Sequence, residues 1–174
     1  GTYERWDGAD GHHVAAVLGL DLINSELIRS KSYTVCIDTV NGAGGSICID
    51  LLHRLGCRVH GVNTEPTGNF PRGAEPVPEN LGDLCACVRE HGADVGFAVD
   101  PDVDRLSIVN EHGEAIGEEY TLALAADFVM GKAGGPVVCN LSTSMMIDYA
   151  AARHGTIVYR APVGEINVVD EMRA

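Results

Sequence analysis

Basic residues are scarce in this chain of 174 residues. Its 12 lysines and arginines stand against 25 aspartates and glutamates, which gives a formal net charge of −13. A protein that binds nucleic acid by neutralising phosphates needs a basic surface, and an anionic membrane attracts clusters of basic residues. The shortage of positive charge therefore argues against both partners. A small anionic ligand would need a metal ion or a few well-placed cations.

The sequence also lacks a membrane-length apolar run, a secretory signal and any C-x-x-C pair. Its six cysteines lie in apolar segments, so we expect buried, reduced thiols in a cytoplasmic protein. A hydrophobic share of 45% is typical of a globular chain, and the length suffices for a large domain and part of another. Because the chain begins at Gly1 without a methionine, we expect it to be a fragment.

Strand and helix patterns alternate along most of the chain, which predicts the α/β class. Apolar, β-branched runs at 33–38, 57–62 and 94–99 predict strands, and helical periodicity appears at 47–55 and 81–91. We expect these elements to form a three-layer α/β/α domain with a mixed, mostly parallel sheet. Residues 106–116 resemble a hairpin that would add an antiparallel strand.

The expected domain boundary is the glycine-rich run at 131–135. It divides a metal-binding α/β domain, residues 31–131, from an incomplete α/β domain, residues 132–174. Residues 1–30 are expected to be a linker and the end of a preceding domain. A helix at 120–130 is apolar on all sides, so we expect it to be buried or to bridge two domains.

Several polar stretches allow more than one interpretation. The turn at 41–45 could cradle a phosphate at a helix N-terminus, but it fits no established glycine motif, and a structural tight turn is favoured. Glu118 and Glu119 could join a metal site, although helix capping is favoured. His12 and His13 are adjacent and share no helix face, so a metal site there is disfavoured. The irregular, proline-rich segment 63–80 is long enough to suggest function.

The densest acidic cluster, Asp100, Asp102 and Asp104, directly follows the third predicted strand. On an extended segment these three side chains would point to one side. Carboxylates this close repel one another unless a cation lies among them, and oxygen ligands suit Mg2+. Arg105 adds a planar guanidinium suited to phosphate. The alternative is that Asp-Pro-Asp forms a turn that caps the strand.

Residues 100–105, Asp-Pro-Asp-Val-Asp-Arg, resemble the D-G-D-x-D-R metal loop of the α-D-phosphohexomutases. That family includes phosphoglucomutase, phosphomannomutase and phosphoglucosamine mutase. Residues 35–45 are similar to the strand and turn that open its second domain. The resemblance extends over about residues 14–169 through four further stretches, which are 68–71 (Gly-Asn-Phe-Pro), 75–81 (Glu-Pro-Val-Pro-Glu-Asn-Leu), 117–121 and 163–165.

The resemblance implies a four-domain cytoplasmic enzyme that moves a phosphate between the 1- and 6-positions of a hexose through a phosphoserine. It matches Asp100, Asp102 and Asp104 to the Mg2+ ligands and Arg105 to the phosphoryl contact. The implied partner is a phosphohexose substrate shared with domains absent from this chain. Glucosamine-phosphate is favoured, with mannose-phosphate and glucose-phosphate as alternatives.

The chain departs from the family pattern in places. Pro101 stands where glycine is usual, and Val103 stands where many members have a small residue. No stretch resembles the T-A-S-H-N-P phosphoserine loop or the G-E-x-S-G sugar loop, so we expect the chain alone to be inactive.

Two other hypotheses remain: a stand-alone metal-binding module, and a phosphatase with an aspartate nucleophile. The module lacks EF-hand spacing, and Lys132 is the only lysine after the loop that a phosphatase could use.

Overall fold

The computed structural model describes residues 1–174 and divides into two compact units, Gly1–Ile116 and Gly117–Ala174. The division therefore lies before helix α5 (Glu119–Ala133) and not at the glycine-rich run that follows Met130. Helix α5 belongs to the second unit because Met130 packs against Ala150 and Ala151 of helix α6 (Met146–Arg153). The glycine-rich run ends α5 instead of separating domains, with Gly134 as its C-cap at φ 69°.

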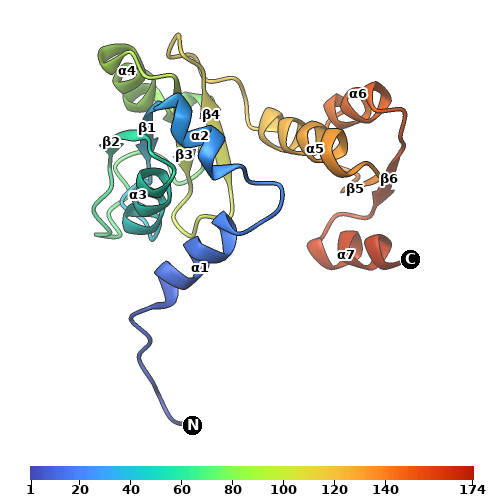
Figure 1. Cartoon of the computed structure of the whole chain (residues 1–174), viewed down its shortest axis with the longest axis horizontal. Coiled ribbons are helices and arrows are strands. Elements are labelled where there is room, and N and C mark those ends of the chain that lie inside the picture. The colour runs from blue at the N-terminus through green and yellow to red at the C-terminus, as the bar shows by residue number, and fades with distance from the viewer. The chain divides into compact units, whose positions relative to one another are not determined.

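A four-stranded sheet forms the centre of the first unit (Figure 1). Its strand order is β2 (Arg58–Val62), β1 (Thr34–Asp38), β3 (Val95–Val99) and β4 (Leu106–Val109). Strand β1 pairs in parallel with both β2 and β3, whereas β4 runs antiparallel to β3. This is the mixed, mostly parallel sheet that the sequence predicts.

Helices cover both faces of this sheet. Helix α3 (Gly45–Arg54) packs Leu52 against Val35 and Ile37 of β1. Helix α4 (Gly82–His91) packs Leu84 and Val88 on the other face, in the cluster that contains Cys36. Cys36 is the β1 residue between Val35 and Ile37. Successive β1 side chains thus enter opposite cores, as the pleat of a strand requires. The predicted three-layer α/β/α arrangement is confirmed.

The N-terminal segment is more ordered than expected. Helix α1 (Ala9–Leu18) begins within the predicted linker and contacts α3. Helix α2 (Ser25–Lys31) is capped by Asn24, whose Oδ1 accepts the N–H of Leu27 at 2.9 Å. The segment 63–80 is irregular as predicted and contains one 3-10 turn, η1 (Pro78–Asn80). None of the helices combines the length and hydropathy that a membrane crossing requires.

The second unit contains two parallel strands, β5 (Val137–Asn140) and β6 (Val158–Ala161), with helices α5, α6 and α7 (Glu165–Arg173). The expectation that the apolar helix α5 is buried is wrong for most of its surface. Only Ala123 and Met130 are buried, whereas Leu122, Leu124 and Phe128 are 47%, 50% and 49% exposed. A two-stranded sheet and one neighbouring helix can contact only a single stripe of α5.

Candidate metal centre

The turn after β1 and the loop after β3 lie side by side at the carboxyl edge of the sheet. From β1 the chain crosses through α3 to β2 on one side, and β3 then pairs with β1 on the other side. Open α/β sheets bind ligands at such a reversal of strand order. The contact is direct, because the N–H of Ala43 donates to the carbonyl oxygen of Pro101 at 2.8 Å.

Three carboxylates converge in the loop after β3. Asp100, Asp102 and Asp104 each offer an oxygen, and these oxygens lie within 4.8 Å of one another. Asp100 is buried, with 2% of its surface exposed, whereas Asp102 and Asp104 are exposed. One anchored and two exposed carboxylates form an all-oxygen donor set, the type that Mg2+ prefers, so the residues present fit this ion.

The carboxylates converge through a turn and not through the extended segment expected from their spacing. The N–H of Val103 donates to the carbonyl oxygen of Asp100 at 3.2 Å, and the N–H of Arg105 donates to Asp100 Oδ1 at 3.1 Å. Val103 has φ 67°, a left-handed conformation that is unusual for a β-branched residue. The turn interpretation and the metal interpretation therefore describe the same loop.

Asp100 and Asp104 shift each other's pKa in opposite directions. Burial by itself raises the pKa of Asp100, but the hydrogen bond from the Arg105 N–H and the contacts with Asp104 and Asp102 outweigh it, so its pKa lies below the ordinary value. The hydrogen bond with Asp100 and then the charge of that carboxylate raise the pKa of Asp104. The two groups can share a proton when no cation is present.

Arg105 lies at the rim of the carboxylate cluster. Its Nη1 is 3.8 Å from Asp100 Oδ2, and its Nε is 3.9 Å from Asp104 Oδ1. The same Nη1 forms an ion pair with Glu75, and the side chain of Arg105 is 55% exposed. The guanidinium is therefore held near the carboxylates and remains accessible to an anionic ligand.

The sequence did not identify three residues that support this loop, namely Asp38, Arg72 and Glu75. Asp38 is fully buried at the end of β1 and pairs with Arg72, whose Nε lies 2.8 Å from Asp38 Oδ2. The available signal was the charged residue Asp38 at the end of an otherwise apolar strand. Nothing in the sequence indicated that its partner would come from the irregular segment 63–80.

The glycine-rich turn after β1 supports the loop and offers few donors to a phosphate. Its consecutive N–H groups donate to protein oxygens: Asn41 to Asn63 at 2.6 Å, Gly42 to Thr39 at 2.8 Å and Ala43 to Pro101. The structural-turn interpretation is thus favoured over a phosphate cradle.

The glutamates considered as metal ligands lie in the second unit. Glu118 makes no side-chain hydrogen bond to cap α5, so the expected side-chain capping is not found. Glu119 Oε2 instead accepts the N–H of Ser144 at 3.2 Å. His12, which was also considered as a metal ligand, packs against Trp6, and the centroids of the two rings are 5.5 Å apart.

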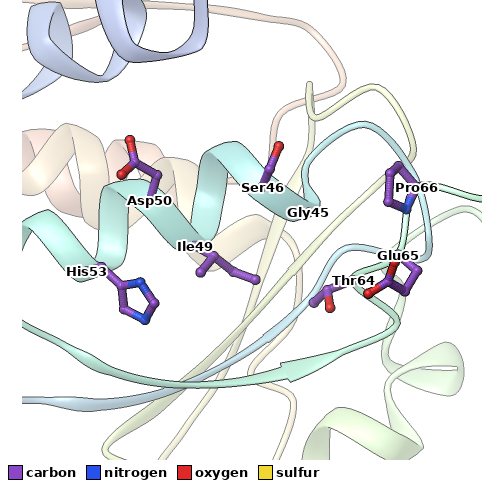
Figure 2. A pocket seen from close by; sticks show the side chains of 8 residues that line it. All are labelled: Gly45, Ser46, Ile49, Asp50, His53, Thr64, Glu65 and Pro66. Atoms are coloured by element: carbon purple, nitrogen blue, oxygen red, sulfur yellow. The ribbon is translucent and has the colours of Figure 1, made fainter.

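A separate pocket of about 480 Å³ lies between α3 and the turn that follows β2 (Figure 2). Asp50, His53 and Glu65 are among its lining residues, and their side chains do not converge on one point in Figure 2. Asp50 is already paired with Arg54 on the same helix at 2.9 Å. None of the three clustered aspartates lines this pocket.

Comparison with protein families matches two parts of the chain. Residues 12–113 match phosphoglucomutase/phosphomannomutase, alpha/beta/alpha domain II, and residues 117–174 match alpha/beta/alpha domain III. The chain is similar to a phosphoglucomutase/phosphomannomutase of Thermococcus kodakarensis, with 40% identity over 84% of this chain and 32% of the relative. It is also similar to a probable phosphoglucosamine mutase of Pyrococcus abyssi, with 39% identity over 88% of this chain and 34% of the relative.

Solved structures give the same result. A phosphoglucomutase/phosphomannomutase family protein from Burkholderia thailandensis has a TM-score of 0.78 and 26% identity, covering 99% of this chain and 37% of that one. A putative phosphomannomutase from Thermus thermophilus has a TM-score of 0.80 and 27% identity, covering 94% of this chain and 38% of that one. The chain spans about a third of the length of its relatives. The matches along the whole chain and its three-layer unit show that it belongs to the phosphoglucomutase/phosphomannomutase family.

Proposed function

We propose that this chain supplies the metal-binding part of a phosphohexomutase, which moves a phosphate between the 1- and 6-positions of a hexose. The observation that carries the proposal is the convergence of Asp100, Asp102 and Asp104 beside Arg105 at the reversal of strand order. The names of the relatives support the same activity, and several of them are phosphoglucosamine mutases. We therefore favour glucosamine-phosphate as substrate, with mannose-phosphate and glucose-phosphate as alternatives.

In this proposal Asp100, Asp102 and Asp104 hold Mg2+, which offsets negative charge on the phosphoryl group. Arg105 contacts the phosphoryl oxygens through its exposed guanidinium, where fixed positive charge stabilises the transferring group. The resemblance assigns the phosphoryl group to a serine in a T-A-S-H-N-P stretch, which these 174 residues do not contain. Residues 1–174 alone are then incapable of turnover.

The proposed compartment is the cytoplasm. All six cysteines are free in the structure, and Cys36 and Cys139 are buried. Reduced thiols persist in reducing compartments, which supports this placement. The phosphatase alternative is less well supported, because the ammonium group of Lys132 lies over the ring of Phe128, 5.7 Å from its centroid.

The proposal is tested with the full-length gene product. Its rates on the 1-phosphates of glucosamine, mannose and glucose are measured with Mg2+, beside the Asp102→Asn variant. Asp83→Asn, an exposed aspartate on α4, is the matched control. We expect Asp102→Asn to lose at least about a hundredfold in kcat, the scale of losing one electrostatic stabiliser, while the control keeps its rate. Full activity of Asp102→Asn would refute the metal assignment.

A further inference from the structure

Arg72 is a nearly buried cation outside the acidic loop. Its side chain is 7% exposed and that of its partner Asp38 is 0% exposed. Buried arginines are uncommon, and burying an ion pair is costly unless further hydrogen bonds satisfy both groups. The contacts of Arg72 therefore need an explanation.

The guanidinium of Arg72 joins the ends of the two strands beside the metal loop. Its Nε donates to Asp38 Oδ2 at the end of β1, and its Nη2 donates to the carbonyl oxygen of Val99 at the end of β3, each at 2.8 Å. Its Nη1 donates to the carbonyl oxygen of Gly73 at 3.0 Å. Val99 directly precedes Asp100. The fixed fork of arginine makes these three contacts at once, which a lysine cannot do in the same geometry.

Asp38 connects this contact to the turn after β1. Its Oδ1 accepts the N–H of Val40 at 2.8 Å, and its carboxylate also accepts Asn63 Nδ2 at 3.4 Å. The same turn continues to Ala43, whose N–H donates to Pro101 inside the metal loop. Arg72 is therefore linked to the loop both through Val99 and through the turn.

Residues 72–76, here called the bracing segment, also contact the far end of the loop. Glu75 forms an ion pair with Arg105, and the carbonyl oxygen of Pro76 accepts the hydroxyl of Ser107, which is buried in β4. One short segment thus contacts the chain before the first aspartate and after the last. The Glu75 pair is exposed and therefore weak as a source of stability, but it places one nitrogen of the Arg105 guanidinium against a carboxylate of this segment.

We propose that Arg72 is a positioning residue for the metal loop and that Glu75 orients the phosphoryl-contacting Arg105. The inference rests on the proposed function, since that function gives the loop its role as a Mg2+ site. Arg72 touches neither the ion nor the substrate in this proposal. It holds the backbone from which Asp100 extends, so that the three carboxylates keep their spacing before a ligand arrives.

The test compares Arg72→Lys with Arg89→Lys in the 174-residue chain. Arg89 is a matched control, because its Nη1 donates to the carbonyl oxygen of Gly113 at 2.7 Å at the opposite end of the sheet. Hydrogen–deuterium exchange of residues 99–106 is measured without metal, followed by calorimetric titration with Mg2+. If Arg72→Lys does not fold, Asp38→Asn weakens the same contact while keeping an oxygen for the N–H of Val40.

We expect hydrogen–deuterium exchange of residues 99–106 to be about tenfold faster in Arg72→Lys than in the unsubstituted chain. This factor follows from losing a hydrogen bond to a charged group. Mg2+ affinity should fall by a similar factor, and both should remain unchanged in Arg89→Lys. Loop exchange equal to that of the unsubstituted chain would overturn the positioning role. If exchange responds to Arg72→Lys but the full-length Asp102→Asn variant keeps its mutase activity, the proposed metal centre fails and the positioning of the loop stands.

Discussion

The position that a Cβ atom would occupy on Gly42 lies 2.5 Å from the carbonyl oxygen of Pro101. A side chain at Gly42 would therefore collide with the backbone of the acidic loop. The neighbouring N–H of Ala43 donates to that same oxygen. The turn after β1 and the loop after β3 are thus fitted to each other at a point where only glycine leaves room.

The first prediction concerns Gly42→Ala. The added methyl group must push the loop away from the turn, so we expect a loss of about 1–3 kcal/mol in the free energy of unfolding, the usual cost of forcing atoms into a packed site. Mg2+ affinity should fall at least about tenfold, since the carboxylates lose their spacing. Urea denaturation and calorimetric titration measure the two effects.

Gly82→Ala is the control for this substitution. Gly82 begins α4, and beyond its chain neighbours and its own helix backbone no atom lies within 4 Å of the position that a Cβ would take there. The added methyl group should therefore stabilise the chain slightly or leave it unchanged. Its Mg2+ affinity should equal that of the unsubstituted chain. Equal behaviour of the two alanine variants would show that the contact between Gly42 and Pro101 does not constrain the loop.

The second prediction is that Mg2+ binds weakly to the 174-residue chain. Mg2+ in phosphoryl-transfer sites usually shares its ligands between carboxylates and phosphate oxygens, and only the carboxylates of Asp100, Asp102 and Asp104 are present here. We expect a Kd of about 1 mM or weaker, measured by calorimetry. A Kd in the low micromolar range, lost in Asp104→Asn, would instead support a stand-alone metal-binding module.

The third prediction is that Mg2+ affinity rises with pH. The contact with Asp100 raises the pKa of Asp104, so at acidic pH a proton occupies a group that the ion needs. As the pH rises through this elevated pKa, the proton leaves and affinity increases to a plateau. Titrations between about pH 4 and 8 should show the rise continuing above the ordinary aspartate pKa near 3.9 before the plateau is reached. An affinity that is flat over this interval would contradict the raised pKa of Asp104.

The fourth prediction concerns the thiols of buried Cys36 and half-buried Cys87, whose sulfur atoms are 2.8 Å apart. Burial and the hydrogen bond with Cys87 raise the pKa of Cys36 from 9.0 to about 12. The folded state therefore keeps a proton that the unfolded state loses above pH 9. This contribution to stability is fully present below pH 9 and is lost as the pH rises toward 12.

Thermal melts between about pH 8 and 11 test this thiol. The Tm of the unsubstituted chain should fall more steeply with pH than that of Cys36→Ala, whatever the offset between them at pH 8. Cys85→Ala removes a thiol at the edge of the same core and should retain the steep fall. Parallel curves for the unsubstituted chain and Cys36→Ala would rule out the contribution of Cys36.

Much of the first unit could be predicted because its signals are local. The apolar runs of β1 and β3 and the helical faces of α3 and α4 follow directly from periodicity. The position of the acidic loop followed from its place after β3. The sequence also resembled the family, and the comparisons confirm that resemblance.

The supporting contacts of the site could not be predicted because they are not local. Arg72 and Asp38 are 34 residues apart, and periodicity carries no information about which strand end a loop residue reaches. The division between the units was misplaced for a similar reason. A glycine-rich run marks a flexible or turning backbone, but the unit to which α5 belongs depends on its packing against Ala150 and Ala151.

The left-handed conformation of Val103 has a thermodynamic consequence. A β-branched residue rarely adopts φ 67°, so the surrounding hydrogen bonds must hold it there when the chain folds. The conformational entropy of the loop is then lost during folding and not when an ion arrives. Binding of an ion to such a loop should therefore order the backbone little. The enthalpy of binding should come mainly from exchanging water ligands of the ion for carboxylate oxygens.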